Sequence, residues 1–512
     1  MQKESPDTKT CSTPSMVKYS LGACTESLVL NSFFGFSMLY YTKALGLGAE
    51  LAGLATFIAT FWDAISDPIM GHISDNTRSR FGKRHPYMLF GGLAMIASFF
   101  FIWYVPDFFK TELIIGSVSI SAMQMLFGYL VMMNLLLRTA YTVFVVPYTA
   151  LGFEICEDYD GRSKIQGIRN CLSMAANLLG PAMAWFIFFN NNSEEIKATQ
   201  IAQNYINMGT VFAVVSLVFL FLMLFLTAKY IKDSRGDKSC HDNAGAFFKN
   251  MKEILSDKYP RWVFIFMFFV LLGIVLVSTL QMFVFDDFMK LGGLQKTITH
   301  GGTMVGMALG SLSLAFFVRK FDKKGAVCVA VVWSVFCELV LAAIFLTGFM
   351  KPGHIIGGTA IPAGTMVDGV ATTADQIAGG FPIAFIIFAL FHGAYWFGNG
   401  ILMPIAVSMI ADVSEINRIR TGVNKDASYA AMFSLAMKIS MAVSGLVAGY
   451  CLLWTGFKSG ADIVQTPESV WRVCALTFVV GPLASLAALG LISKYPVTKK
   501  FIEDMRAEHS QD

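Results

Sequence analysis

The sequence predicts an all-α polytopic membrane protein with twelve transmembrane helices. Hydrophobic residues make up 55% of the 512 residues and charged residues only 14%, against roughly 25% charged residues in a soluble globular protein. A spanning helix needs about 20 predominantly apolar residues, and stretches of that kind recur along the whole chain. This composition excludes an ordinary soluble protein and indicates a single polytopic membrane domain.

Twelve apolar stretches are long enough to cross a bilayer. They cover residues 18–43, 50–74, 87–105, 113–153, 164–190, 205–231, 261–287, 297–318, 325–350, 380–411, 427–456 and 469–494. The stretch 113–153 is longer than one span needs, but it has no proline before Val146. We therefore expect one long, tilted helix there that begins outside the membrane.

Lysine and arginine gather in alternate loops. With both termini placed in the cytoplasm, the cytoplasmic segments hold 29 of these 39 residues and the outer segments hold eight. Because cations are retained on the cytoplasmic side, this bias predicts that both termini are cytoplasmic, and in a bacterium the membrane would be the plasma (inner) membrane. The net charge of +4 then reflects topology, and no nucleic-acid partner is expected.

A basic linker near the midpoint divides the spans into six plus six. The predicted parts are a cytoplasmic tail 1–17, an N-terminal half 18–231, a linker 232–260, a C-terminal half 261–494 and a cytoplasmic tail 495–512. RFGKR at 80–84 and KFDKK at 320–324 are similar loops 240 residues apart. They suggest two six-helix pseudo-repeats, the major facilitator arrangement, with a solute site between the halves. The alternative is that both loops are basic only because they are cytoplasmic.

The cysteines, the histidines and the N-terminus exclude several classes of protein. The nine cysteines are scattered, and the seven histidines show no metal-ligand spacing, so we expect no metal centre and no cofactor. No nucleophile–base pattern is visible, and an enzyme is not expected. The first seventeen residues lack an apolar core, which predicts insertion through the first transmembrane helix rather than a cleaved signal.

Two carboxylates lie inside the second predicted span. ATFWDAISDPIMGHISD places Asp63 and Asp67 four residues apart on one helix face. Each charge costs about 2.5–3.5 kcal/mol at a helix centre, and the two repel unless they share a proton, a cation or a lysine. Lys438 and the hydroxyls of Thr139 and Thr142 are candidate partners. A cation-coupling site meets this need, and the alternative is a static Asp/Lys pair that holds the bundle together.

The run WDAISDPIMGHISDNTRSRFGKRHPYML at 62–89 strongly resembles the signature of the glycoside–pentoside–hexuronide cation symporters, the melibiose-permease-like branch of the major facilitator superfamily. The similarity extends to YTVFVVPYTAL at 141–151, to Asp160, Arg162 and Arg169, and to an acidic residue followed by Lys438 within 411–438. These blocks lie in both halves of the chain.

The resemblance implies roles for individual residues. Asp63 and Asp67 would be the cation-site carboxylates, Thr142 an accessory cation ligand and Lys438 their positive neighbour. The predicted solute residues are Arg169, facing the central cavity, with Glu26, Ser27 and Val145. Ser27 and Val145 replace the two sugar-binding aspartates of the melibiose permease, which argues against galactoside specificity.

The loop after the second span is a predicted gate. Its residues are Gly71, Asp75, Arg78, Lys83 and Arg84. In the family, charge pairs at this loop hold the two halves together while the cavity faces outward, and Gly71 would allow close helix approach. Asp412 and Glu415 are the expected opposing anions. The alternative is that these charges only set topology.

Further polar residues lie in apolar stretches. For Arg138 the sequence is equally compatible with a position facing the cavity and with a purely structural one, in an ion pair or near the outer surface. Glu338 is expected at the periphery, tied to a neighbour. Gln281, Trp396 and Asn399 fit either packing or solute binding.

The predicted function is a cation-coupled (Na+ or H+) symporter of a sugar or glycoside-type solute, working by alternating access as a monomer. Two carboxylates with a threonine favour Na+. The alternatives are a symporter of a non-sugar amphiphile such as a lysophospholipid, and a non-transporting receptor on the same fold, which would be expected to lose the paired carboxylates.

Overall fold

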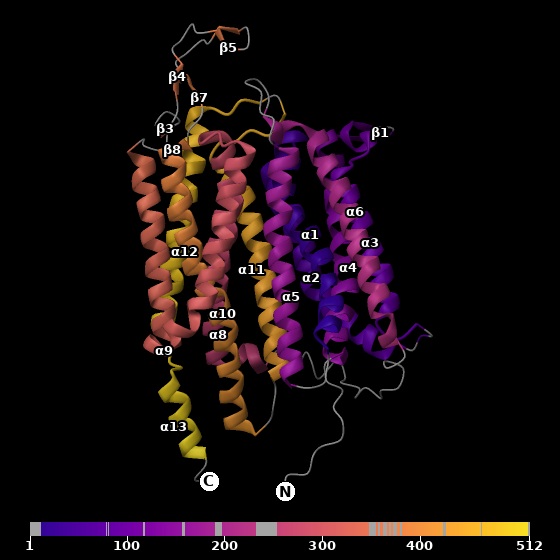
Figure 1. Cartoon of the computed structure of the whole chain (residues 1–512), viewed down its shortest axis with the longest axis vertical. Helices are drawn as coiled ribbons and strands as arrows, with labels where there is room; N and C mark the ends of the chain where they lie inside the picture. The colour runs from indigo at the N-terminus through magenta and orange to yellow at the C-terminus, as the bar shows by residue number, and fades with distance from the viewer. Residues whose placement is uncertain are drawn as a thin grey trace. The chain divides into compact units, whose positions relative to one another are not determined.

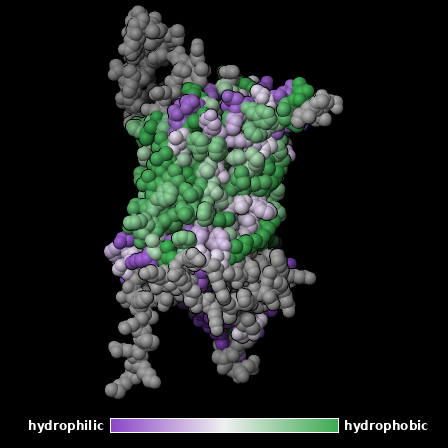
Figure 2. All heavy atoms as spheres, turned by 90° about the vertical axis from the view of Figure 1, so that its right-hand side faces the viewer, coloured by the Kyte–Doolittle hydropathy of each residue, from purple (hydrophilic) through white to green (hydrophobic). Residues whose placement is uncertain are grey.

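A computed structural model gives the structure of the chain (Figure 1). It describes residues 12–77, 79, 81–115, 118–155, 159–189, 197–231, 253–347, 355–356, 359–361, 366–367, 370–371, 376–378, 381–422, 426–461 and 463–509. The face in Figure 2 carries a broad band of apolar side chains between polar ends. Within the described residues, nine helices are long and apolar enough to cross a membrane. The predicted all-α polytopic architecture is confirmed.

The chain forms two compact units, of which the first comprises residues 1–264 and 425–464. Its long helices are α1 Thr13–Leu39, α2 Ala49–Asn76, α3 His85–Trp103, α4 Ala122–Ile155, α5 Tyr159–Met183, α6 Ala202–Thr227 and α11 Asp426–Trp454. Short π or 3-10 turns are η1 Tyr40–Ala44, η2 Asp107–Lys110, η3 Ala184–Phe188, η4 Ala198–Gln200 and η5 Ala228–Ile231. The helix α11 thus packs with the helices of the N-terminal half.

The second unit comprises residues 265–424 and 465–512. Its elements are α8 Lys258–Phe283, which begins in the first unit, η7 Val284–Phe288, α9 Gly293–Leu346, α10 Ile383–Thr421, α12 Pro467–Ser493 and α13 Lys499–His509. Within α9 the backbone breaks at Asp322, with φ 60° and ψ 173°. This element therefore covers the predicted span 297–318 and, as far as Leu346, the predicted span 325–350. The predicted C-terminal tail contains α13, whose Arg506 pairs with Glu415 of α10.

The prediction of one helix over 113–153 is wrong at its start. The segment opens with an antiparallel hairpin, β1 Leu113–Ile115 and β2 Val118–Ile120, in which Leu113 faces Ile120. Three isoleucines and a valine in these two strands favour extended backbone, and the helix α4 begins only at Ala122. Apolarity alone does not separate a short strand from the first turns of a helix.

The segment between α9 and α10 also contains short strands. They are β3 Ile355–Ile356, β4 Thr359–Ile361, β5 Met366–Val367, β6 Val370–Ala371, β7 Gln376–Ala378 and β8 Phe381–Pro382. Their antiparallel pairs, β3 with β8, β4 with β7 and β5 with β6, are nested as in one long hairpin. The stretch 351–379, which separates the predicted spans 325–350 and 380–411, therefore includes strands among its described residues.

Glycines bring α2 and α11 into backbone contact. A Cβ atom at Gly53 would lie 2.9 Å from the carbonyl oxygen of Gly445, and one at Gly449 would lie 2.5 Å from that of Ala49. Larger side chains would force the helices apart. This close approach positions the next turns of α11, which carry Lys438, beside the acidic residues of α2.

Candidate cation and solute site

The helices α2, α4 and α11 bring four predicted site residues together. Lys438 Nζ lies 3.0 Å from Asp63 Oδ2 and also forms an ion pair with Asp67. Thr142 Oγ1 lies 3.0 Å from Asp63 Oδ1 and 2.9 Å from Asp67 Oδ1, so its single proton serves one carboxylate at a time. Ser66 Oγ lies 3.1 Å from the same hydroxyl. The result is a compact group of oxygen atoms around one ammonium.

A second cation, Arg138, completes this group. Its Nη1 lies 3.7 Å from Asp63 Oδ2, and both side chains are less than 5% exposed. The guanidinium also lies over the rings of Phe33 and Phe34, at 5.7 and 4.6 Å from their centroids. The structure thus places Arg138 in a buried ion pair, away from the outer surface. Two carboxylates therefore face two cations, and the described group is close to electroneutral.

Arg138 was not assigned to the cation site from the sequence, although one signal was available. Arg138, Thr142 and Val145 recur at helical spacing and lie on one face of α4. Asn134, one turn earlier, is buried, and neither of its amide atoms has a hydrogen-bond partner among the described residues. Buried polar atoms of this kind indicate that water or a ligand completes the site.

A second polar group joins α1, α4 and α5. Arg169 Nη2 donates to Glu26 Oε2 at 3.2 Å, and Tyr141 donates to Glu26 Oε1 at 2.9 Å. The guanidinium of Arg169 lies 5.1 Å from the ring centroid of Tyr148. Both charged side chains remain partly exposed, at 17% and 18%. The predicted solute residues Glu26 and Arg169 thus contact each other directly.

Further polar pairs extend this group along α1 and α5. Ser27 Oγ lies 2.6 Å from Ser173 Oγ, and Asn31 bonds Asn177. Arg169, Ser173 and Asn177 recur every fourth residue, a helical signal that sequence reasoning missed. Val145, also predicted here, is half-buried on α4 and offers no hydrogen-bonding side chain.

The predicted gating residues are only partly described. Arg78 and the side chain of Asp75 lie outside the described residues. A Cβ atom at Gly71 would meet Val146 at 3.9 Å, an ordinary van der Waals contact, so among the described residues no close helix approach is seen at Gly71. Lys83 is half-buried, whereas Arg84 is buried and donates to Ser74 Oγ at 2.8 Å.

The expected opposing anions have other partners. Asp412 pairs with Lys323 at 2.6 Å, and Glu415 pairs with Arg506. All four residues lie in the second unit. These anions therefore link the end of α10 to its neighbours within that unit.

Replacing Arg84 with alanine tests the gate. If the Arg84–Ser74 contact supports the outward-facing state, Arg84→Ala should lower the reactivity of a reporter cysteine, Glu50→Cys, at the predicted outer end of α2 by at least about twofold, a shift of roughly 0.4 kcal/mol. Labelling with a membrane-impermeant thiol reagent measures it. Arg472→Ala, at an exposed arginine of α12, is the control. Unchanged reactivity would reduce Arg84 to a topology signal.

The polar residues that the sequence singled out in apolar stretches of the second unit are buried inside that unit. Glu338 is 1% exposed and buried in the unit, not at its periphery, and its Oε2 has no partner among the described residues. Trp396 donates to His392 Nε2 at 3.1 Å, and Asn399 donates to the carbonyl oxygen of Tyr395 at 3.2 Å. These are contacts within one helix. Gln281 is also buried.

Comparisons with known proteins agree with this architecture. The family model described as MFS/sugar transport protein matches residues 19–499. The putative glycoside/cation symporter YagG of Escherichia coli is 23% identical over 95% of this chain and 92% of its own. The sodium-dependent lysophosphatidylcholine symporter 1 of Xenopus tropicalis is 30% identical over 29% of this chain and 27% of its own.

A solved structure shares the fold. The inward-open xylose transporter XylE of Escherichia coli aligns with a TM-score of 0.56 and 15% identity, covering 96% of this chain and 98% of its own. The family match covers most of the chain, including every residue of the two polar groups. The chain therefore belongs to the MFS/sugar transport family, and it is an integral multi-pass transporter rather than an enzyme.

Proposed function

We propose that the chain is a cation-coupled symporter that moves a sugar or glycoside-type solute by alternating access. The observation that carries this proposal is the pair Asp63 and Asp67, inside the long helix α2 of a multi-pass transporter, sharing Thr142 and Lys438. Ionisable groups at this depth are costly and mark ion or substrate pathways by default. A static pair would explain their stability but not the hydroxyls that complete an oxygen-rich site.

The coupling ion in this proposal is Na+, with H+ as the alternative. Asp63, Asp67, Thr142 and Ser66 supply the oxygen atoms that a hard cation prefers. Because Lys438 already occupies these oxygens, Na+ binding must displace its ammonium. Lys438 is on α11, so its displacement would loosen α11 from α2 and couple ion binding to a conformational change.

The solute site in this proposal is the neighbouring group on α1, α4 and α5. Glu26 and Arg169 supply charged partners, and the serine and asparagine pairs supply both donors and acceptors, as the hydroxyls of a sugar require. Tyr141 on α4 donates to Glu26 from the same helix face that presents Arg138 and Thr142. The α4 face thus connects the solute group with the cation group.

A lysophospholipid is the second candidate solute. The partial likeness to a lysophosphatidylcholine symporter favours it, as does the replacement of the two sugar-binding aspartates by Ser27 and Val145. The proposed topology keeps both termini in the cytoplasm, in the plasma membrane of a bacterium, and the proposed unit of transport is the monomer.

Uptake into proteoliposomes tests the proposal. A panel of radiolabelled hexosides, pentosides, uronides and lysophosphatidylcholine is offered with a Na+ gradient or an H+ gradient imposed separately. We expect a tenfold Na+ gradient to drive roughly tenfold accumulation of one sugar-type solute at 1:1 coupling. Accumulation driven only by an H+ gradient would show that the coupling ion is H+ and not Na+. Accumulation of the lysolipid alone would show that the solute is a lysophospholipid and not a sugar. Binding without uptake of any solute would favour the receptor.

A further inference from the structure

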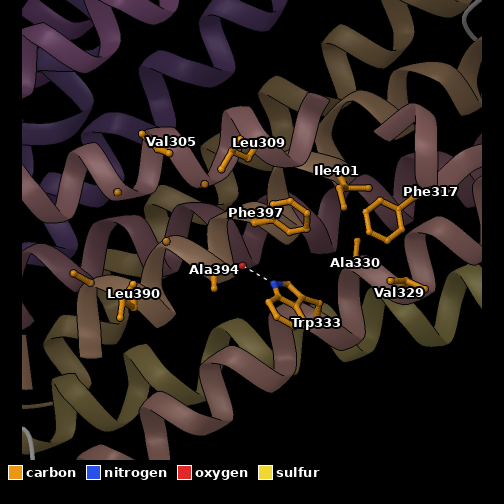
Figure 3. A pocket seen from close by; sticks show the side chains of 14 residues that line it. Val305, Leu309, Phe317, Val329, Ala330, Trp333, Leu390, Ala394, Phe397 and Ile401 are labelled. Atoms are coloured by element: carbon orange, nitrogen blue, oxygen red, sulfur yellow. Dashed lines mark hydrogen bonds between the residues drawn. The ribbon is translucent and has the colours of Figure 1, made fainter. Parts of the chain in front are cut away.

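An apolar groove lies between α9 and α10 in the second unit (Figure 3). Its volume is about 650 Å³, within the range of about 300–1,000 Å³ typical of ligand sites. Both halves of α9 line it, with Val305 and Leu309 before the break at Asp322 and Trp333 after it. Leu390, from α10, is 67% exposed at its edge.

The groove exists because its floor is built from small residues. Gly302, Gly306, Gly393 and Ala394 line it, and a Cβ atom at Gly306 would collide with the carbonyl oxygen of Gly393 at 2.1 Å. The indole N–H of Trp333 donates to the carbonyl oxygen of Ala394 at 2.8 Å, the contact drawn in Figure 3. The lining side chains offer no other hydrogen-bonding group, so the groove does not suit a sugar.

The surroundings of the groove point to a hydrocarbon occupant. Both α9 and α10 are long and apolar enough to cross a membrane, and Leu309 and Leu390 on the groove are more than half exposed, as side chains that contact lipid are. An unfilled apolar groove forfeits the dispersion contacts of its walls. A lipid acyl chain supplies these contacts without leaving a polar group unpaired.

One end of the groove is positively charged. Phe317 lines the groove and stacks on Phe321, with 6.5 Å between ring centroids. Lys320 Nζ lies 5.2 Å from the centroid of Phe321, and Lys320 lies one helical turn beyond Phe317 on the same face. Arg319 beside it is also exposed. Neither cation has an ion pair with any residue that the structure describes.

The next two lysines, Lys323 and Lys324, have hydrogen-bond or ion-pair partners within the second unit. Lys323 pairs with Asp412 at 2.6 Å, and Lys324 donates to the carbonyl oxygen of Ser493 at 2.7 Å. Lys320 therefore lies at this end of the groove without an ion pair to a described residue, and Arg319, its neighbour in the chain, is a second exposed cation at the same end of the helix. Basic residues at the cytoplasmic mouth of a groove between membrane helices are suited to anionic lipid headgroups, and this is the side that the lysine and arginine distribution predicts to be cytoplasmic.

We propose that the α9–α10 groove binds an anionic phospholipid, with an acyl chain along Trp333 and the phosphate at Arg319 and Lys320. The acyl chain fills the space between α10 and the two halves of α9. The headgroup then lies close to the break at Asp322, at the membrane surface. This site is separate from the cation and solute groups, and it does not depend on which solute is carried.

Quenching of Trp333 fluorescence by brominated lipids tests the proposal. The full chain is placed in vesicles containing phosphatidylglycerol or phosphatidylcholine with bromine on the acyl chains. The Trp333 signal is the difference between the parent and Trp333→Phe. We expect brominated phosphatidylglycerol to quench it at least about twofold more strongly than brominated phosphatidylcholine.

Two variants make the test decisive. Arg319→Gln/Lys320→Gln should abolish the preference for phosphatidylglycerol while quenching by phosphatidylcholine remains. The control is Trp454, which is 71% exposed on α11. Its signal is the difference between the parent and Trp454→Phe, and both lipids should quench it equally. Equal quenching of Trp333 by the two lipids, or a preference that survives in the double variant, would overturn the proposal.

Discussion

Asp63→Asn is expected to abolish solute accumulation driven by a cation gradient while leaving solute exchange intact. Asp63 is 2% exposed and contacts Lys438, Thr142 and Arg138. Asparagine keeps the shape but removes the negative charge that a bound cation needs. With a tenfold gradient and 1:1 coupling, the accumulation ratio should fall from roughly ten to about one. Gradient-driven uptake and equilibrium exchange in proteoliposomes measure the two properties separately.

The control for this variant is Asp107→Asn, which alters an exposed carboxylate paired with Lys110 and should leave accumulation unchanged. Asp63→Asn also leaves Arg138 without its nearest anion, and breaking a buried pair costs about 3–5 kcal/mol. If the variant fails to insert, Asp63→Asn/Arg138→Gln removes the unpaired cation as well. Full accumulation by either variant would show that Asp63 is not the coupling carboxylate.

Much of the fold could be predicted from hydropathy, because a spanning helix must bury its own backbone hydrogen bonds within an apolar segment of known length. The break at Asp322 lies between the predicted spans 297–318 and 325–350, because each of these apolar segments is long enough for one span. The hairpin 113–120 could not be predicted in this way. Its apolar residues suit a strand and a helix equally, and pairing between neighbouring strands decided the outcome.

The two parts of the site differed in how far they could be predicted. Asp63 and Asp67 share a face because the chain between them is helical, a local property. The contact of Arg138 with Asp63 depends on how α2 and α4 are rotated against each other, which no local pattern specifies. Arg138 could therefore be recognised as a buried charge but not placed beside Asp63.

Arg138→Gln is expected to strengthen cation binding at least about tenfold. The guanidinium lies 3.7 Å from Asp63 Oδ2, so it competes with a bound cation for the same carboxylate. Two unit charges 4 Å apart interact by about 4 kcal/mol at an effective dielectric constant of 20. A repulsion between Arg138 and the bound cation of about a third of that size, lost in Arg138→Gln, would account for the tenfold change. The cation concentration that gives half-maximal uptake measures it.

Arg138→Lys is the matched variant, because it keeps the charge while losing the planar fork. It should bind the cation about as weakly as the parent, whereas an effect of packing against Phe33 and Phe34 would appear in both variants. An unchanged or raised half-maximal concentration in Arg138→Gln would contradict the electrostatic role. In the proposed mechanism the two cations have different roles. Lys438, which links α2 to α11, would transmit ion binding, whereas Arg138 on α4 would set the cation concentration that half-maximal uptake requires.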